Sequence, residues 1–391
     1  MSTESINKIT LLSQGTPYLP DLQNALNQAG FDAEIVKLKN VEEIKTKALE
    51  LYEQDKAGTW LVFRDDDDMY QLSRIGLTQE QQSAIFPTRK HSGLQFLGSK
   101  AGFTRFCNEH EISHPYTLIV DTPDELKSVL SNYSYPLFVK GERGGGGASV
   151  FKLFQLSDAD QNKLAEKDYP AVVQVAIESP LISVEAFYSH GQLVAWMYSE
   201  ELGSISKFGP NYARTYLNPK NQSFIPTLQL LGFHAGLHGF VNCGLLRDAE
   251  GGYLLFEADL RPNAWHYLFH HFGIDLKSAV ASAALGNKVV PLFPVSLSAQ
   301  GIELRLRSRE ILMAMQNKDL HRYMQVVLQY RKVDRSRWVQ GAPDSSGRFI
   351  AAFKLVLMFA LKVVFDRMPA RFIAWAKSRR LSGRIVWRLL G

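Results

Sequence analysis

Over the first hundred residues, hydrophobic and polar positions alternate between a strand-like and a helix-like pattern. Short apolar runs typical of buried strands occur at 6–12, 33–38 and 59–63. Between them lie two stretches with helical spacing, 19–29 and 42–53. Because strand and helix follow each other at short intervals, we expect a parallel sheet with helices packed on it.

Four consecutive acids, Asp65 to Asp68, follow directly on the third of these predicted strands. The carboxyl ends of parallel strands are where open α/β sheets bind ligands, so one interpretation is a site for a cationic group of a substrate. Runs of like charge are more often solvated turns, and we favour that second interpretation.

A run of four glycines, Gly144–Gly147, separates two short strand-like segments further along the chain. The first segment is apolar and ends in Lys140, and the second is Ala148–Lys152. A loop without side chains lets backbone N–H groups approach an anion such as a phosphate, and Lys140 would add a positive charge beside it. The alternative is a flexible hairpin tip with a solvated lysine.

Most of the remaining elements up to residue 260 are strands. Helical patterns occur at 100–109, 123–130 and 228–239. Strand-like segments occur at 116–120, 171–177, 183–187, 192–198, 240–246 and 253–260.

Four short segments, taken in this order and spacing, resemble the ATP-grasp ligase superfamily, which includes biotin carboxylase and D-alanine–D-alanine ligase. Ser99-Lys100 is similar to the start of the helix with the first ATP lysine, and Lys140 with the glycine run is similar to the second lysine and its phosphate loop. Val172–Ile177 resembles the hinge strand that contacts adenine, and Phe256–Pro262 (FEADLRP) resembles the acid–x–Asn–x–Arg–Pro signature. The resemblance covers roughly residues 6 to 275.

The resemblance implies an α/β fold of the ATP-grasp type. We expect a Rossmann-like pre-ATP-grasp domain over 1–98 and an ATP-grasp domain over 99–290, with a small lobe at about 115–177 and a large lobe at about 178–290. A helical extension at 291–340, including a basic helical stretch from residue 301 to 337, and a basic amphipathic tail at 341–391 complete the predicted organisation.

The ATP site is implied by the same comparison. Its two lysines would pair with the α- and β-phosphates, and the hinge strand would read adenine through its backbone. The implied ATP-binding residues are Lys100, Lys140, Gly144, Gly145, Gly146, Gly147, Ala148, Gln174, Val175, Ile177, Glu178 and Glu185.

A metal site and a catalytic cation are expected on the FEADLRP strand. Glu257 and Asp259 are two residues apart, so their side chains face the same side, as a Mg²⁺ (or Mn²⁺) site requires. By resemblance, Arg261 would steady the transferred phosphoryl group or an acyl-phosphate. The alternative is an ion pair on an edge strand.

Three positions depart from the superfamily pattern. Asp259 stands where Asn is usual, and the segment around Gly244 lacks the usual second metal-binding acid. The acid that usually binds the ribose hydroxyls falls at Leu181, and Glu178 or Glu185 would have to replace it. These losses leave room for a one-metal enzyme or for a nucleotide-binding protein without the chemistry.

The implied function is an ATP-dependent ligase that joins a carboxylate to an amine or a thiol. It would activate an unknown small-molecule carboxylate as an acyl-phosphate, join it to an unknown amine, and release ADP and phosphate. The alternative is a catalytically reduced, nucleotide-binding regulatory protein at a membrane.

The charge of the chain is concentrated at its C-terminal end. The whole chain carries +5 and residues 341–391 carry +8, so the remainder is −3 and gives no support to a nucleic-acid partner. Phe349–Phe365 is apolar but is interrupted by Lys354 and Lys362, and it falls short of the roughly 20 residues of a membrane span. We expect residues 348–391 to bind an anionic membrane surface as an amphipathic helix; a helical cap or a homodimer interface is the alternative.

The two cysteines, Cys107 and Cys243, show no disulfide pattern, which fits a reducing compartment. The N-terminal residues lack the pattern of a signal peptide. We therefore expect a cytoplasmic protein that is peripheral on the inner face of the membrane.

Overall fold

The chain divides into two compact units, Met1–Glu303 and Leu304–Gly391. The computed structural model describes residues 8–14, 27, 30–54, 59–63, 66–143, 147, 149–160, 168–204, 207–209, 211–219, 221–263, 265–284, 286–292, 301–306, 310, 313 and 314. Several predicted segments lie outside these residues: the predicted helix at 19–29 except Asn27, the loop residues Gly144–Gly146 and Ala148, most of the extension at 291–340 and all of the tail at 341–391.

The N-terminal residues form a three-stranded parallel sheet, as the alternating pattern predicts. The strand order is β2-β1-β3, with β1 at Lys8–Gln14, β2 at Asp32–Leu38 and β3 at Thr59–Phe63. Helix α2 (Val41–Gln54) buries Ile44 and Ala48 in the same core as Leu12 of β1. Three short helices that the sequence pattern did not indicate follow β3: α3 (Asp66–Leu72), α4 (Gln79–Ile85) and α5 (His91–Leu94).

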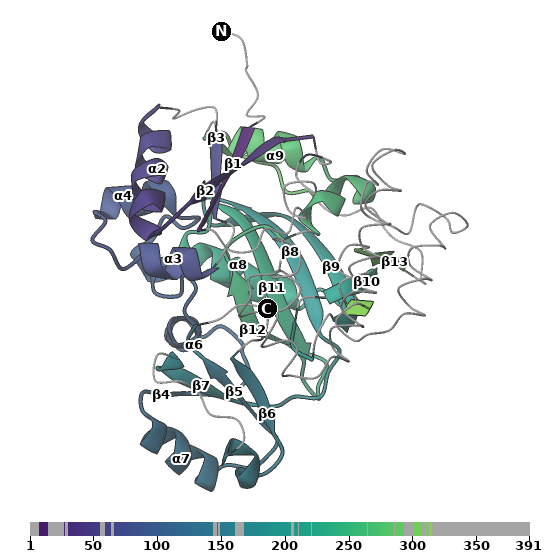
Figure 1. Cartoon of the computed structure of the whole chain (residues 1–391). Helices are drawn as coiled ribbons and strands as arrows, with labels where there is room; N and C mark the ends of the chain where they lie inside the picture. The colour runs from purple at the N-terminus through teal and green to yellow at the C-terminus, as the bar shows by residue number, and fades with distance from the viewer. Residues whose placement is uncertain are drawn as a thin grey trace, which may run out of the picture. The chain divides into compact units, whose positions relative to one another are not determined.

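The next part of the chain is a four-stranded antiparallel sheet with strand order β4-β7-β5-β6. Its strands are β4 (Thr117–Val120), β5 (Leu137–Gly141), β6 (Val150–Leu153) and β7 (Ala171–Val175). Helix α7 (Pro123–Asn132) packs Leu126, Val129 and Leu130 against the sheet, and α6 (Lys100–Glu109) lies on the opposite side (Figure 1). The short helix η1 (Leu156–Asp160) follows β6.

A six-stranded sheet with order β12-β11-β8-β9-β10-β13 carries the larger core. The strands are β8 (Ile182–Ser189), β9 (Gln192–Ser204), β10 (Asn211–Tyr216), β11 (Gly239–Arg247), β12 (Tyr253–Asp259) and β13 (Ile302–Arg305). The associated helices are α8 (Phe224–Ala235), η3 (His266–Phe272) and α9 (Leu276–Ala284). The sequence pattern did not indicate β10, and residues 302–305 form a strand although they lie in a stretch predicted to be helical.

The C-terminal end of α8 is capped by a segment from the N-terminal part of the chain. Helix α8 ends before Gly236, whose φ of 63° is left-handed. The last carbonyls of the helix accept hydrogen bonds from the segment 88–92: the donors are Thr88 Oγ1 to Ala235, Arg89 N to Gly236 at 2.8 Å, Lys90 Nζ to Phe233 at 2.7 Å and Ser92 Oγ to His234 at 2.6 Å. Carbonyls that lack partners within the helix are therefore satisfied by a segment more than 140 residues earlier in the chain.

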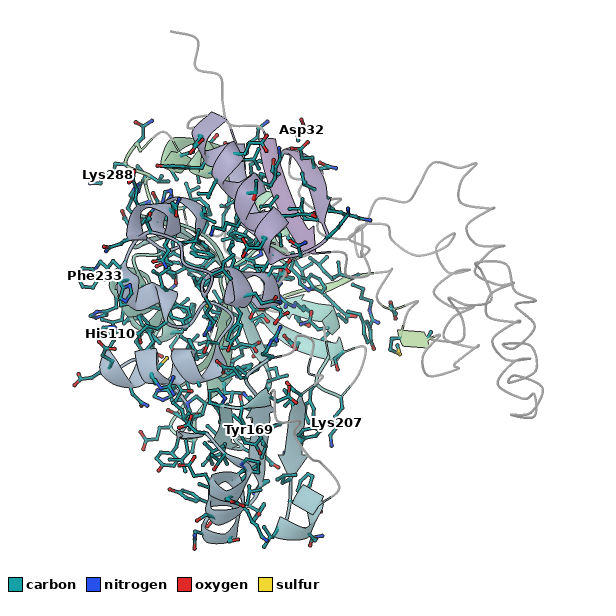
Figure 2. All side chains as sticks on the ribbon, turned by 60° about the vertical axis from the view of Figure 1, so that its left-hand side comes forward. Asp32, His110, Tyr169, Lys207, Phe233 and Lys288 are labelled. Atoms are coloured by element: carbon teal, nitrogen blue, oxygen red, sulfur yellow. The ribbon has the colours of Figure 1, made fainter. Side chains whose placement is uncertain are left out.

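A histidine of α8 stacks on a histidine at the end of α6. The ring centroids of His234 and His110 are 4.3 Å apart, and His234 also lies beside Phe233; Figure 2 labels His110 and Phe233. Both cysteines are buried and unpaired. Within the described part of the chain, no helix is long and apolar enough to cross a bilayer.

The first turn of α3 is held against the turn that precedes α6. Gly98 adopts φ of 63°, and a Cβ at this position would overlap the backbone carbonyl of Asp66. A glycine is therefore required both for its backbone conformation and for the close approach of the two segments.

We predict that Gly98→Ala lowers the free energy of unfolding by about 2–4 kcal/mol, because left-handed strain and overlap with Asp66 act together. Gly76→Ala is the matched control, since Gly76 has φ of 68° but no atom within 4 Å of the added Cβ. That control should lose only about 1 kcal/mol. Urea unfolding followed by circular dichroism measures both values, and equal losses in the two variants would contradict the contact.

Candidate functional site

A buried carboxylate joins the helix that begins with Lys100 to the strand that carries Lys140. Glu142 is 2% exposed; its Oε2 accepts a hydrogen bond from the Ala101 N–H at 2.9 Å, and its Oε1 accepts one from the Ser99 hydroxyl. Lys100 Nζ lies 3.4 Å from the Glu142 carbonyl oxygen. An anion at a helix N-terminus is favourable, so this contact fixes the position of α6 relative to β5.

Lys140 lies half-buried at the end of β5. Its Nζ donates to Gln174 Oε1 at 2.8 Å, and Gln174 Nε2 in turn donates to Thr117 Oγ1 at 3.0 Å. The Lys140 Nζ also lies 5.1 Å from the centre of the Phe256 ring. Burial lowers the pKa of Lys140 to about 8; nearby Glu257 raises this pKa and Lys100 lowers it further.

The strand β12 contains a β-bulge at the candidate metal site. Gly244 of β11 pairs with Glu257 and Leu245 pairs with Leu255, so Phe256 is the extra residue. A Cβ at position 244 would lie 2.7 Å from both Glu257 Cγ and Phe256 Cζ. The side chains of Glu257 and Phe256 therefore fill the space that an acidic side chain at position 244 would need. The absence of a second acid here is thus explained by close packing between β11 and β12.

Glu257 and Asp259, two residues apart on β12, both have raised pKa values. Glu257 keeps exposed surface, but the protein around its carboxyl group removes part of its hydration and raises its pKa; Glu201 and Asp66 raise it further, while Lys140 and Lys100 lower it. Burial likewise raises the pKa of Asp259 well above its ordinary value, with Asp66 and Glu257 adding to the effect and Arg261 opposing it. Neighbouring carboxylates that repel each other are suited to bind a hard cation.

The Glu257–Asp259 site fits a Mg²⁺ ion that takes most of its ligands from a bound nucleotide and from water. In the described residues, no group of three or more His, Cys, Asp or Glu side chains could hold a metal ion. Mg²⁺ in phosphoryl-transfer sites commonly takes one or two protein carboxylates, with phosphates and water as the remaining ligands. Two carboxylates are what β12 offers.

Arg261 is held between two acids. Its Nε and Nη2 donate to Asp66 Oδ2 at 2.8 and 2.5 Å, and its Nη2 also donates to Asp259 Oδ2 at 3.1 Å. Next to this pair, Arg143 Nε and Nη2 donate to Asp67 at 2.9 Å each. Asp66–Asp68 of the acidic run, for which we favoured a solvated turn, therefore form the first turn of α3, and Asp66 and Asp67 pair with the two arginines.

A second group of charged side chains lies two strands away from Asp259, because Asn242 of β11 pairs with Asp259 on one side and with Glu185 of β8 on the other. Glu185 is fully buried, and its carboxylate accepts hydrogen bonds from Arg214, Tyr216 and Asn263. Burial by itself would lower the pKa of Arg214, but the adjacent acids raise it above its ordinary value. Both oxygens of Glu185 are thus occupied by protein donors, which favours a structural role, and its predicted ATP contact stays a prediction.

The hinge strand ends earlier than predicted. β7 stops at Val175, whose N–H donates to the Tyr116 carbonyl at 3.1 Å, and the Ala176 N–H donates to Pro136 at 3.1 Å. Ile177 and Glu178 follow outside the strand, and Glu178 is exposed.

Lys207 is exposed at the surface, with Nζ 5.3 Å from the centre of the Phe208 ring (Figure 2).

The structure thus brings together side chains from distant parts of the sequence. Mutual electrostatic effects on pKa link Lys100, Lys140, Glu257, Asp259, Arg261 and Asp66. Sequence reasoning missed Glu142, for which no motif exists. It also missed Asp66 and Asp67 as arginine partners, although their place after β3 was a signal.

Several solved structures of the ATP-grasp fold share this arrangement of sheets. The ADP complex of N5-carboxyaminoimidazole ribonucleotide synthetase is 13% identical, with a TM-score of 0.58 over 80% of this chain and 85% of that chain. Phosphoribosylamine–glycine ligase from Thermotoga maritima is 16% identical, with a TM-score of 0.54 over 74% and 78%. L-Amino acid ligase from Bacillus licheniformis is 14% identical, with a TM-score of 0.52 over 72% and 75%.

The chain therefore has the ATP-grasp fold, as the order of its motifs predicted. No protein-family model matches the sequence, and a sequence search of curated proteins finds no match either. The likeness is one of fold, carried at low sequence identity.

We predict that MgATP affinity falls as the pH rises through about 8, because the free protein loses the Lys140 charge there. The dissociation constant should rise about tenfold between pH 7 and pH 9. Lys140→Arg is the control, since a guanidinium stays charged over this range and should give a flat profile. Fluorescence titration with MgATP measures both, and a flat profile for the unsubstituted protein would count against a direct Lys140–phosphate contact.

Proposed function

We propose that this protein is an ATP-dependent ligase that activates a small-molecule carboxylate as an acyl-phosphate and joins it to an amine. The observation that carries the proposal is geometric, within an ATP-grasp fold: Lys100 contacts Glu142 beside β5, Lys140 lies 5.1 Å from the ring centre of Phe256 next to Glu257, and Arg261 contacts Asp259. The solved relatives include an ADP complex and ligases that use amines or amino acids, according to their names.

In this proposal the two lysines bind the nucleotide. Lys100 and Lys140 approach from α6 and β5, which Glu142 holds together, so their spacing is set before ATP arrives. The N–H groups of Val175 and Ala176 are committed within the small lobe. We therefore assign adenine recognition to the backbone of Ile177 and Glu178, and the ribose contact to the Glu178 carboxylate.

The reaction would proceed by two displacements. A carboxylate oxygen of the substrate attacks the γ-phosphorus, the β–γ bond breaks, and ADP leaves. The amine nitrogen then attacks the acyl carbon, and phosphate leaves as the amide forms. Arg261 lies beside Asp259 and would hold the negative oxygens of the phosphoryl group as charge develops.

Glu257 and Asp259 would hold Mg²⁺, or Mn²⁺ in its place. Such an ion neutralises charge on the phosphate oxygens. The pKa values of both carboxyl groups are raised even though Lys140, Lys100 and Arg261 oppose the shift, so a further cation beside them would favour their ionised forms.

We predict that Arg261→Ala lowers the turnover of ADP release by at least about 100-fold, because a preorganised cation is lost from the reacting phosphoryl group. Lys140→Ala should weaken ATP binding as well. The measurement is Mg²⁺-dependent ADP release with a panel of acid–amine pairs.

Lys288→Ala is the control for this prediction, because Lys288 is an exposed surface lysine outside the site (Figure 2). Turnover that survives Arg261→Ala or Lys140→Ala would show that the site is misassigned. Tight ATP binding without ADP formation over the whole panel would favour a second function, a nucleotide-binding regulatory protein. The packed position at Gly244, with no room for a second acid, is the observation on its side.

We further propose that residues 348–391 bind an anionic membrane surface on the cytoplasmic side. The supporting observation is the charge of +8 over residues 341–391, combined with apolar residues and with Trp375 and Trp387. Basic amphipathic segments of this composition are attracted to anionic lipid by charge and are anchored by aromatic residues.

We predict that full-length protein co-sediments with anionic liposomes and that deletion of 349–391 abolishes this binding. Neutral liposomes and high salt should each weaken it, because the attraction is largely electrostatic. A full-length variant with Arg379→Gln, Arg380→Gln and Arg384→Gln keeps the apolar residues and should bind several-fold less. Indifference of the full-length protein to anionic liposomes would exclude the membrane role.

A further inference from the structure

Helix α3 presents two adjacent acids to arginines from two different lobes. Asp66 pairs with Arg261 at the end of β12, and Asp67 pairs with Arg143 just beyond β5. The Asp67–Arg143 contact is bidentate, with two parallel N–H···O bonds of 2.9 Å. Isolated surface ion pairs contribute little, but a bidentate arginine–carboxylate pair also fixes orientation.

The Arg143 end of this arrangement is tied to the base of the β5–β6 connection. Ser149 Oγ donates to the Arg143 carbonyl at 2.6 Å, and the Gly141 N–H donates to the Ser149 carbonyl at 2.9 Å. The Arg143 guanidinium also lies 5.8 Å from the ring centre of Tyr70 on α3. Asp67 therefore holds the residue that immediately precedes the glycine run.

The Arg261 end is fixed from two sides. Asp66 and Asp259 both accept hydrogen bonds from the Arg261 guanidinium, and they come from α3 and β12, which are far apart in the sequence. The backbone of Asp66 is itself seated against Gly98, two residues before Lys100. The direction of the guanidinium is thus set by a carboxylate whose own position is constrained.

We propose that Asp66 and Asp67 are positioning residues with separate tasks in the proposed ligase reaction. Asp66 orients Arg261 for the chemical step, and Asp67 holds Arg143 and the base of the β5–β6 connection for nucleotide binding. The inference rests on the proposed function, because both tasks are defined by it. Neither acid touches the reacting atoms; each acts through its arginine.

A variant of Asp66 and a variant of Asp67 serve as controls for each other, because the two acids are adjacent, lie in one helical turn and carry the same charge. Asp66→Asn in the full-length protein should lower kcat for ADP release about 30-fold while the Kd for MgATP stays within about twofold. Asp67→Asn should raise the Kd for MgATP about tenfold while kcat at saturating ATP stays within about threefold. Glu50→Gln, which removes an exposed pair with Lys47 on α2, should change neither value.

Conservative variants separate positioning from folding. Asp66→Glu and Asp67→Glu keep the charge and should each recover most of the lost kcat or Kd, respectively. Thermal unfolding of all variants checks that α3 stays folded. If Asp66→Asn does not fold, the Asp66→Glu variant carries the test: a kcat lowered about threefold with unchanged Kd is then expected, and unchanged kcat overturns the proposal.

Equal effects of Asp66→Asn and Asp67→Asn on kcat and Kd would mean that α3 only supports the fold, and would overturn the proposal. Unchanged kinetics in both variants would overturn it as well. Failure of the proposed function gives a different result: the unsubstituted protein then releases no ADP with any acid–amine pair, and the positioning roles fall with it.

Discussion

The contact on which the candidate site depends is the one between the Glu142 carboxylate and the first turn of α6. It places a buried negative charge where the N–H groups of a helix converge, and it bonds the N-cap residue Ser99 at the same time. Because Lys100 begins this helix and Lys140 lies two residues before Glu142, one carboxylate sets the relation of both lysines. Without Glu142, no side chain of this contact would hold the start of α6, with Lys100, to the end of β5, with Lys140.

The elements of this chain were predictable where local pattern and tertiary environment agree. Strand Thr59–Phe63 and helix Lys100–Glu109 have the predicted bounds, because an apolar run and an N-cap serine with helical spacing need no distant partner. Strand Asn211–Tyr216 was missed, because its side chains pair across the sheet, as Arg214 does with Glu185, and mimic a polar loop in the sequence.

The same distinction holds in the candidate site. Lys140, Glu257 and Arg261 lie in short motifs that a reader of the sequence finds. Glu142, which holds the helix of Lys100, carries no motif, and Asp66 was visible only as part of an acidic run, because its pairing with Arg261 comes from a distance across the fold. The missing acid at Gly244 was visible as a departure, but its reason was not. A bulge places Phe256 beside both Gly244 and Lys140, and only the strand register reveals it.

The cap on α8 has a consequence for the modularity of the chain. Residues 1–98 are predicted from the sequence to be a separate domain, yet the segment Thr88–Ser92 closes the end of α8, a helix that packs on the six-stranded sheet. A fragment that starts at residue 99 would expose four carbonyls at that helix end and would lose Asp66 and Asp67. The N-terminal region is therefore not an exchangeable module, and recombination with a related chain would have to carry α8 along with it.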